Sequence, residues 1–197
     1  MGGTSRKWLR GPRGVGFMYV NDTAVLLEPV TLDLYGATWK TGGNGEKFSY
    51  DVREGAGRYE YWEGSVANKL GLGVAVDETL EVGVGNIRER VLELATEVRE
   101  GMVERAGLEL MDVVDGEVGS LSGICSFDVS SIGPAPYVVS SLARRNISVS
   151  TSGRTSTLHD AEERNLPEMM VRFSPHYFNT EEDVERVVRA VMSIDKL

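Results

Sequence analysis

From Asn86 onward, the sequence alternates between amphipathic helical patterns and short apolar runs. The first pattern predicts a helix because apolar residues recur every three or four positions, at Ile87, Val91, Leu94, Val98 and Met102. Asn86 and Glu89 have the spacing of an N-cap and its capping box, which predicts where this helix begins. Gly107 predicts its end, as the residue that follows the C-cap.

The patterns that follow this helix predict strands and helices in the order β-β-α-β-β-α. The expected strands are 108–114, 120–129, 147–151 and 169–174, and the expected helices are 136–145 and a last one carrying Val184, Val187, Val188 and Val191. Asp115 and Gly116 predict a turn, Thr180 is the expected N-cap of the last helix, and the polar stretch 152–167 is expected to be a loop. This order predicts a compact α+β unit.

The residues before Gly64 contain fewer recognisable elements. Residues 14–20 and 24–30 predict two short strands, and the glycine-rich stretch 41–57 predicts a loop. Because these elements are too few to close a domain, we expect them to belong to a larger sheet. The predicted fold class is α/β, divided into residues 1–63, a connecting helix at 64–85 and an α+β domain at 86–197.

The connecting helix combines large and small apolar residues. Its predicted apolar face consists of Val66, Leu70, Val74 and Leu80, and glycines at 83 and 85 are expected to end it. Gly71, Gly73 and Ala75 are small enough to allow a close approach to a neighbouring segment. We therefore expect this helix to pack tightly on another part of the chain.

Composition excludes several classes of protein. The 21 Lys+Arg and 30 Asp+Glu residues give a net charge of −9, which argues against nucleic acid as the main partner. The single cysteine, Cys125, excludes an internal disulfide framework and indicates a reducing compartment. No apolar run approaches the ~20 residues that span a bilayer. We expect a cytoplasmic protein without a membrane partner. We also expect no metal site, because His159 and Glu163 have no further ligands nearby.

The segment around Lys7 reads Arg-Lys-Trp-Leu-Arg-Gly-Pro-Arg-Gly-Val-Gly-Phe-Met-Tyr over residues 6–19. Taken alone, a lysine near a terminus is typical of a solvated charge. However, the segment resembles the lysine segment of the class V aminotransferases, which are pyridoxal-phosphate enzymes of fold type I. Their usual form is His-Lys-Trp-Leu, two variable residues, then Pro-Lys/Arg-Gly-x-Gly-Phe-Leu-Tyr. The resemblance implies that Lys7 forms the Schiff base with the cofactor, although Arg6 stands where the family has histidine.

A second segment begins at Arg172 and reads Arg-Phe-Ser-Pro-His-Tyr-Phe-Asn-Thr-Glu-Glu-Asp-Val. Taken alone, it predicts a strand, a turn and a capped helix. It also resembles the C-terminal segment of class V enzymes, Arg-x-Ser-x-x-x-Tyr-Asn-Thr-x-Glu-Glu-Val, with Phe178 in place of tyrosine. There the arginine binds the substrate α-carboxylate, a role suited to a guanidinium because it offers two parallel donors and stays charged. The resemblance implies this role for Arg172.

The residues between these two segments indicate which branch of the family is closest. Residues 58–63 and 69–76 resemble the loop and helix that join the two domains. Trp62 and Glu63 replace the threonine that reaches the cofactor phosphate in desulfurases, so no phosphate role is assigned to them. The loop 150–160 lacks the cysteine that a desulfurase needs, and Cys125 is expected to be buried and inert. Arg154 on this loop either contacts substrate or is solvated, and the sequence leaves both open.

The resemblance implies an enzyme on the isopenicillin-N-epimerase and kynureninase side of the family. It would act on an amino acid with pyridoxal 5'-phosphate as a homodimer, by transamination, epimerisation or elimination. Because such enzymes are roughly twice as long, the chain is expected to be a C-terminal half: a remnant of the large-domain sheet plus the small α+β domain. The alternative is a non-catalytic α+β binding module or an inactive fragment.

Overall fold

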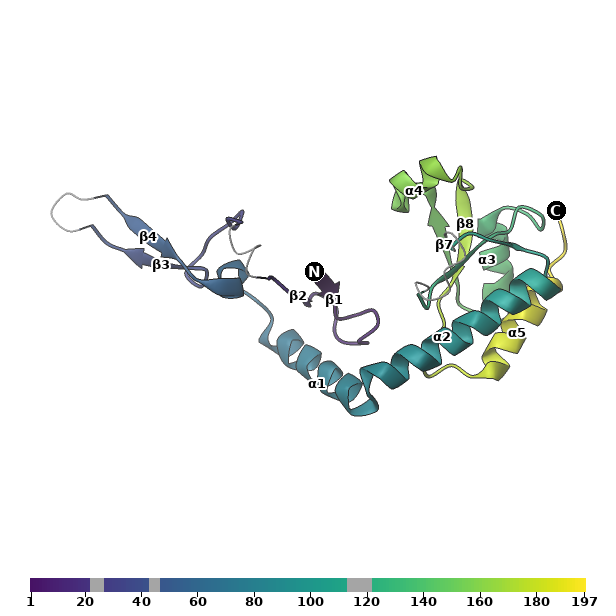
Figure 1. Cartoon of the computed structure of the whole chain (residues 1–197), viewed down its shortest axis with the longest axis horizontal. Helices are drawn as coiled ribbons and strands as arrows, with labels where there is room; N and C mark the ends of the chain where they lie inside the picture. The colour runs from purple at the N-terminus through teal and green to yellow at the C-terminus, as the bar shows by residue number, and fades with distance from the viewer. Residues whose placement is uncertain (22–26, 43–46, 113–121) are drawn as a thin grey trace. The chain divides into compact units, whose positions relative to one another are not determined.

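The computed structural model describes residues 1–21, 27–42, 47–112 and 122–197 (Figure 1). The chain divides into two compact units, Met1–Val82 and Gly83–Leu197, which we call unit 1 and unit 2 and describe separately. The finer division predicted from the sequence, into 1–63, 64–85 and 86–197, stays a prediction.

Unit 1 contains two small antiparallel sheets and one long helix. Its elements are β1 (Gly2–Thr4), β2 (Gly16–Met18), β3 (Ala37–Lys40), β4 (Ser49–Val52), a 3₁₀ turn (Gly55–Tyr59) and α1 (Val66–Val82). β1 pairs with β2, and β3 pairs with β4. The strand predicted at 14–20 is confirmed in shorter form as β2. The loop predicted at 41–57 is wrong in part because β4 lies within it, and Leu27–Val30 of the expected strand 24–30 is not a strand.

Helix α1 is confirmed, but its predicted apolar face is not buried. Val66, Leu70, Val74 and Leu80 are 60% to 69% exposed. Among the described residues of unit 1, the buried hydrophobic side chains are those of Ala37 and Ala75. Unit 1 therefore folds with very little apolar core.

Unit 2 is a four-stranded antiparallel sheet with helices α2, α3 and α5 packed on one face. Its elements are α2 (Val84–Glu100), a π-helical turn (Gly101–Arg105), β5 (Glu109–Leu110), β6 (Cys125–Asp128), α3 (Ala135–Ala143), β7 (Ser150–Gly153), α4 (Leu158–Glu163), β8 (Met169–Phe173) and α5 (Glu181–Met192). The strand order is β5-β6-β8-β7, and each neighbouring pair is antiparallel. Figure 1 shows α2 and α5 side by side.

The core of unit 2 lies between the sheet and helices α2, α3 and α5. Alternate residues of β6 and β8 point into it, among them Phe127 and Phe173, whose rings meet edge to face at 5.7 Å. All of the valines predicted to form the apolar stripe of α5 are buried, and so is most of the stripe predicted for α2. The 3.6-residue period of the helices and the two-residue period of the strands thus predicted this core correctly.

The ends of the helices agree with the sequence only in part. Thr180 caps α5, as predicted, and forms a capping box with Asp183 that was not predicted. Gly107, after the π-helical turn, has a φ of +67°, which confirms it as the terminating residue. The N-cap predicted at Asn86 is wrong: α2 begins at Val84 after Gly83, whose φ of +91° suits glycine.

Two further predictions of unit 2 differ from the structure or fall outside it. Residues 152–167 were expected to be a loop but include α4, a helix too short to show a clear apolar period. The turn predicted at Asp115 and Gly116 lies outside the described residues.

Among the described helices, none combines the length and apolar character that crossing a bilayer requires.

Candidate functional site

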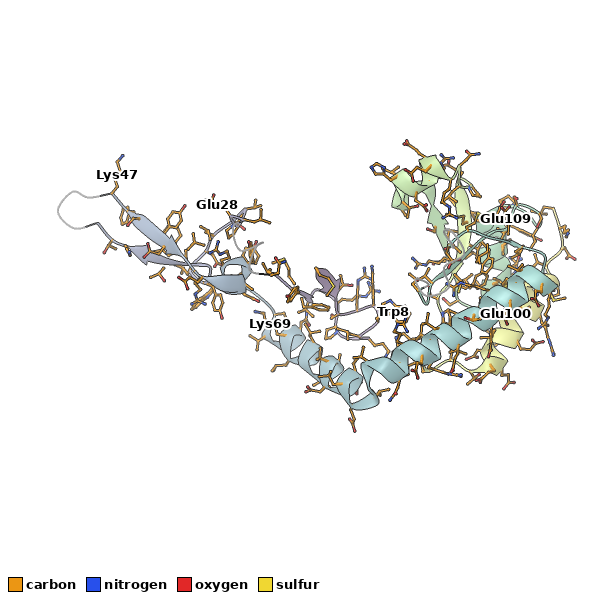
Figure 2. All side chains as sticks on the ribbon, viewed as in Figure 1. Trp8, Glu28, Lys47, Lys69, Glu100 and Glu109 are labelled. Atoms are coloured by element: carbon orange, nitrogen blue, oxygen red, sulfur yellow. The ribbon has the colours of Figure 1, made fainter. Side chains whose placement is uncertain are left out.

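Lys7 lies in the loop that joins β1 to β2 in unit 1. The amide of Arg10 donates to the carbonyl of Lys7 at 2.9 Å, and Arg10 has a φ of +55°, so the loop reverses tightly just after the lysine. The side chain of Lys7 is exposed, and none of the described residues hydrogen-bonds or ion-pairs with its amine. The label on Trp8, the residue that follows Lys7, marks the place of this loop in Figure 2. The amine of Lys7 is therefore accessible from solvent.

Ser5 closes the base of this loop and is completely buried. Its amide donates to the carbonyl of Val15 at 3.1 Å, and its carbonyl accepts from the amide of Gly11 at 2.8 Å. Its hydroxyl donates to the carbonyl of Pro12. Ser5 thus holds both sides of the loop together, which fixes the backbone on which Lys7 is presented.

Helix α1 supports the loop from outside. The side-chain amide of Asn68 donates to the carbonyl of Arg13 at 2.8 Å. One turn on, Gly71 lies against Pro12 so closely that a Cβ there would be 2.6 Å from the proline Cγ. The close approach predicted from small residues is thus confirmed at Gly71, whereas Gly73 faces open space.

Arg172 lies on β8 in unit 2, on the face of the sheet opposite the core. Its neighbours Val171 and Phe173 point into the core, so the pleat directs Arg172 outward. Ser126 on β6 and Ser150 on β7 stand directly across from it in the register. Its Nε atom is buried and has no hydrogen-bond partner among the described residues. An unpaired buried donor is unfavourable, so this Nε–H lacks an acceptor that would stabilise it.

The same outer face carries a small second cluster of buried side chains near α4, formed by Met111, Ala161, Leu166 and Met170. Arg154 anchors the segment that forms it: its guanidinium donates to the carbonyl of Leu166 at 3.0 Å and to that of Ala161 at 3.3 Å. These contacts give Arg154 a structural role, which differs from both alternatives that the sequence left open, substrate contact and solvation. A contact between Arg154 and substrate stays a prediction.

Cys125 is fully buried on β6, where its thiol lies 3.5 Å from the carbonyl of Ala95. Burial raises the pKa of this thiol to about 12, so it stays protonated at neutral pH. The predicted inert thiol is confirmed. In the described ranges, no three acidic, histidine or cysteine side chains gather in a way that could hold a metal ion.

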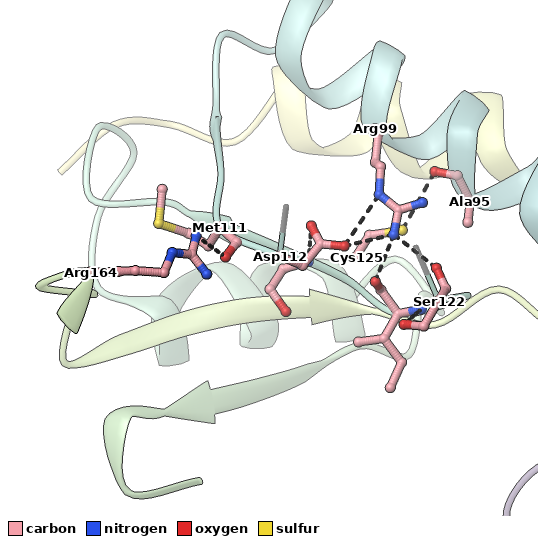
Figure 3. A network of polar contacts seen from close by, with 9 residues as sticks. Ala95, Arg99, Met111, Asp112, Ser122, Cys125 and Arg164 are labelled. Carbon is pink, nitrogen blue, oxygen red and sulfur yellow. Dashed lines mark hydrogen bonds and ion pairs between the residues drawn. The ribbon is translucent and has the colours of Figure 1, made fainter. Parts of the chain in front are cut away.

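A buried ion pair in unit 2 was missed by the sequence reasoning (Figure 3). Arg99 of α2 contacts Oδ2 of Asp112 through Nη2 at 2.6 Å, and both side chains are largely buried. The same Nη2 donates to the carbonyls of Ser122 and Ile124, each at 2.9 Å. The available signal was the position of Arg99, which follows Val98 on the buried face of the helix.

Lys7 belongs to unit 1 and Arg172 belongs to unit 2. Arg154 and Arg172 share unit 2, where Arg154 follows the end of β7 and Arg172 lies farther along β8. The roles predicted for Lys7, Arg172 and Arg154 therefore stay predictions.

Curated relatives match almost the whole chain. Residues 3–187 match the family model described as Aminotransferase class-V. A probable hercynylcysteine sulfoxide lyase of Mycobacterium tuberculosis is 28% identical over 96% of this chain and 43% of that protein. An isopenicillin N epimerase of Amycolatopsis lactamdurans is also 28% identical, over 98% of this chain and 46% of that protein. The chain thus spans less than half the length of these relatives.

Solved structures share the fold. The apo cysteine desulfurase of Thermococcus onnurineus NA1 matches 97% of this chain and 45% of its own with a TM-score of 0.79 and 21% identity. A variant of the cystine C–S lyase C-DES, with glycine covalently linked to its pyridoxal-phosphate cofactor, matches 97% and 45% with a TM-score of 0.75 and 19% identity. These likenesses confirm the α/β fold predicted from the sequence as part of fold type I. With the family match, they show that the chain belongs to the class-V aminotransferase family.

Proposed function

We propose that this chain supplies the cofactor lysine and the substrate arginine of a pyridoxal-5'-phosphate-dependent enzyme that acts on an amino acid. Lys7 is the proposed cofactor lysine and Arg172 the proposed substrate-binding residue. The observation that carries the proposal is the loop around Lys7, which Ser5 closes and α1 supports while the amine stays exposed. An ordered backbone that presents a free amine fits a residue that must bind an aldehyde.

The cofactor, when bound, withdraws electrons from the α-carbon of an amino acid, which is the chemistry shared by transamination, epimerisation and elimination. Lys7 would hold the cofactor and then move a proton at the substrate α-carbon. For this second task its amine must be free of other partners, as it is among the described residues. The same side chain would thus serve binding and proton transfer in turn.

Arg172 would bind the substrate carboxylate and so orient the α-carbon. Its unpartnered, buried Nε supports this proposal, because a carboxylate supplies the acceptor that the guanidinium lacks. Arg154 is a weaker candidate for substrate contact, since two backbone carbonyls already occupy its guanidinium.

Among the reactions of the family, sulfur transfer through a cysteine is the least consistent with this chain. Cys125 is the single cysteine, and it is buried with a pKa raised to about 12. A sulfur acceptor must be an exposed thiolate. We therefore propose an aminotransferase, epimerase or lyase reaction in place of cysteine desulfuration.

We further propose that the enzyme is a cytoplasmic homodimer that needs neither nucleic acid nor a membrane. The single cysteine supports a reducing compartment. Trp39 and Tyr50 support an association surface, because they stand opposite each other in the β3–β4 hairpin and are 48% and 50% exposed. Light scattering coupled to gel filtration tests the dimer, and a monomer mass at all protein concentrations would contradict it.

A non-catalytic binding module of the same fold is the second candidate. Glu63 favours it, because an exposed carboxylate in the loop before α1 would repel a cofactor phosphate. In that case Lys7 would be an ordinary solvated lysine.

Borohydride trapping with pyridoxal phosphate, followed by peptide mass mapping, separates the two candidates. We expect a pyridoxyl adduct concentrated on Lys7 and lost in the variant Lys7→Ala. Lys47→Ala is the matched control, because Lys47 is also exposed in unit 1 and should not affect the adduct. Adducts spread evenly over the lysines would favour the binding module.

A further inference from the structure

The buried Arg99–Asp112 pair connects helix α2 to the strand that borders Arg172. Arg99 reaches Asp112 Oδ2 and the carbonyls of Ser122 and Ile124, so it ties α2 to the residues that lead out of β5 and into β6 (Figure 3). Arg99 is only 6% exposed, and the Asp112 side chain is 15% exposed. The pair is therefore part of the interior and is little screened by solvent.

Asp112 also binds the backbone of Ser126 on β6. Its second oxygen, Oδ1, accepts from the backbone amide of Ser126 at 3.4 Å, and the amide of the neighbouring Met111 donates to the Ser126 carbonyl at 2.8 Å. Both backbone groups of Ser126 on this side are thus bound to residues 111 and 112. The place of Ser126 in the sheet depends on where Asp112 is held.

Ser126 is in turn the register partner of Arg172 on β8. Because the Nε of Arg172 has no partner of its own among the described residues, the orientation of its side chain depends on the strands beside it. We infer that Arg99 and Asp112 are positioning residues for Arg172: they act through Ser126 and touch no ligand themselves. The consequence for substrate binding rests on the proposed function, whereas the effect on the orientation of Arg172 does not.

The replacement Asp112→Asn breaks this link with almost no change of shape. One carboxylate oxygen binds Arg99 and the other binds the amide of Ser126, so both positions need an acceptor. An asparagine offers one oxygen and one NH₂ group. In one orientation the NH₂ group faces the guanidinium of Arg99, and in the other it faces the amide of Ser126, so two donors meet in either case. The double variant Arg99→Met with Asp112→Leu removes the pair altogether, and a buried pair can be replaced by apolar residues without loss of folding.

The test follows the Nε–H signal of Arg172 in nitrogen–proton spectra of the 197-residue chain without cofactor, with acetate as the carboxylate probe. The signal is assigned by its loss in Arg172→Lys. We expect both Asp112→Asn and the double variant to shift this signal and to weaken acetate binding roughly tenfold, which corresponds to about 1.4 kcal/mol of binding free energy. The Nε–H signal of Arg145, which binds α5 at a distance from β6, should not move.

The matched control is the double variant Arg105→Met with Glu185→Leu, which removes an exposed ion pair of unit 2. It should leave both the Arg172 signal and acetate binding unchanged. A folded Asp112→Asn or double variant with a wild-type Arg172 signal and wild-type acetate affinity would overturn the inference. So would an equal shift of the Arg145 signal, because that indicates a general loosening of unit 2. The cofactor trapping at Lys7 is independent of these spectra, so failure of one proposal is distinguishable from failure of the other.

Discussion

The two units of the chain are held together by different means. Unit 2 buries a continuous set of apolar side chains between its sheet and helices α2, α3 and α5. In the described part of unit 1, buried hydrophobic residues are limited to Ala37 and Ala75. Its order comes instead from hydrogen bonds to backbone groups, at Ser5 and Asn68, and from the contact of Gly71 with Pro12.

The two proposed functional residues are therefore supported in different ways. Arg172 stands on a strand whose alternate residues are locked in a core, and burial of apolar surface is the main stabilising term in folding. Lys7 stands on a loop whose geometry depends on a few polar and steric contacts. Changes in apolar packing should therefore affect unit 2 strongly, whereas unit 1 should respond to changes in its loop contacts.

The largest effect is expected from a large-to-small substitution in the core of unit 2. Leu94 is completely buried on α2, so Leu94→Ala should lower the free energy of unfolding by about 2–5 kcal/mol. The matched substitution in unit 1 is Leu70→Ala on α1, where the side chain is 68% exposed and the change should be within ~0.5 kcal/mol. Urea unfolding followed by circular dichroism measures both. Equal losses would show that α1 is buried in solution and would remove the contrast between the units.

A smaller effect is expected where α1 touches the lysine loop. Gly71→Ala places a Cβ 2.6 Å from Pro12 Cγ, and such overpacking costs about 1–3 kcal/mol. Gly73→Ala on the same helix meets open space and should instead stabilise α1 by up to ~1 kcal/mol, since alanine is the better helix former. Amide exchange at Gly11, whose N–H binds Ser5, reports on the loop. Faster exchange in Gly71→Ala alone is expected, and equal rates in both variants would contradict the contact.

These contacts also show what could be derived from the sequence and what could not. The stripes of α2 and α5 and the termination at Gly107 followed from local pattern, because burial imposes a period on the residues that face a core. The same reasoning failed for Val66, Leu70 and Val74, whose helix is correct but whose face is exposed. A pattern indicates which residues would be buried together, but not whether a partner surface covers them.

The polar parts of the candidate site were harder to derive. Lys7 and Arg172 were found through their resemblance to family segments, since neither stands out by composition or periodicity. The partners that hold their surroundings, Ser5 and Asp112, were not found. Their bonds follow no periodic spacing along the chain, and a single serine or aspartate carries no sign of such a contact.

The β3–β4 hairpin of unit 1 should contribute a modest amount through one aromatic pair. Trp39 and Tyr50 face each other across the strands, with ring centroids 5.1 Å apart. Because both rings remain about half exposed, Trp39→Ala should cost only about 0.2–1 kcal/mol, the usual range for a cross-strand pair. Urea unfolding of Trp39→Ala measures this cost, and the ring proton shifts of Tyr50 report on the hairpin itself. A loss as large as that of Leu94→Ala would show that the hairpin belongs to a core.

The smallest difference is expected in the response of the two units to acid. In unit 1, backbone amides, above all that of Trp62, lower the pKa of Asp33 from its ordinary 3.8. In unit 2, Arg105 and then Arg189 lower the pKa of Glu185 from 4.5 to about 2. Because both carboxylates have a lower pKa when folded, each stabilises its unit above the unfolded pKa, and this contribution is lost as pH falls through the folded value.

Carboxyl carbon shifts recorded from pH 6 downward would follow both groups, with the midpoint of Glu185 expected near 2. Both side chains are partly exposed, so salt should weaken the effect at Glu185, which depends on ion pairs. It should weaken the effect at Asp33 less, because there the partners are uncharged backbone amides. A salt-insensitive midpoint at Glu185 would mean that its arginine partners do not hold it.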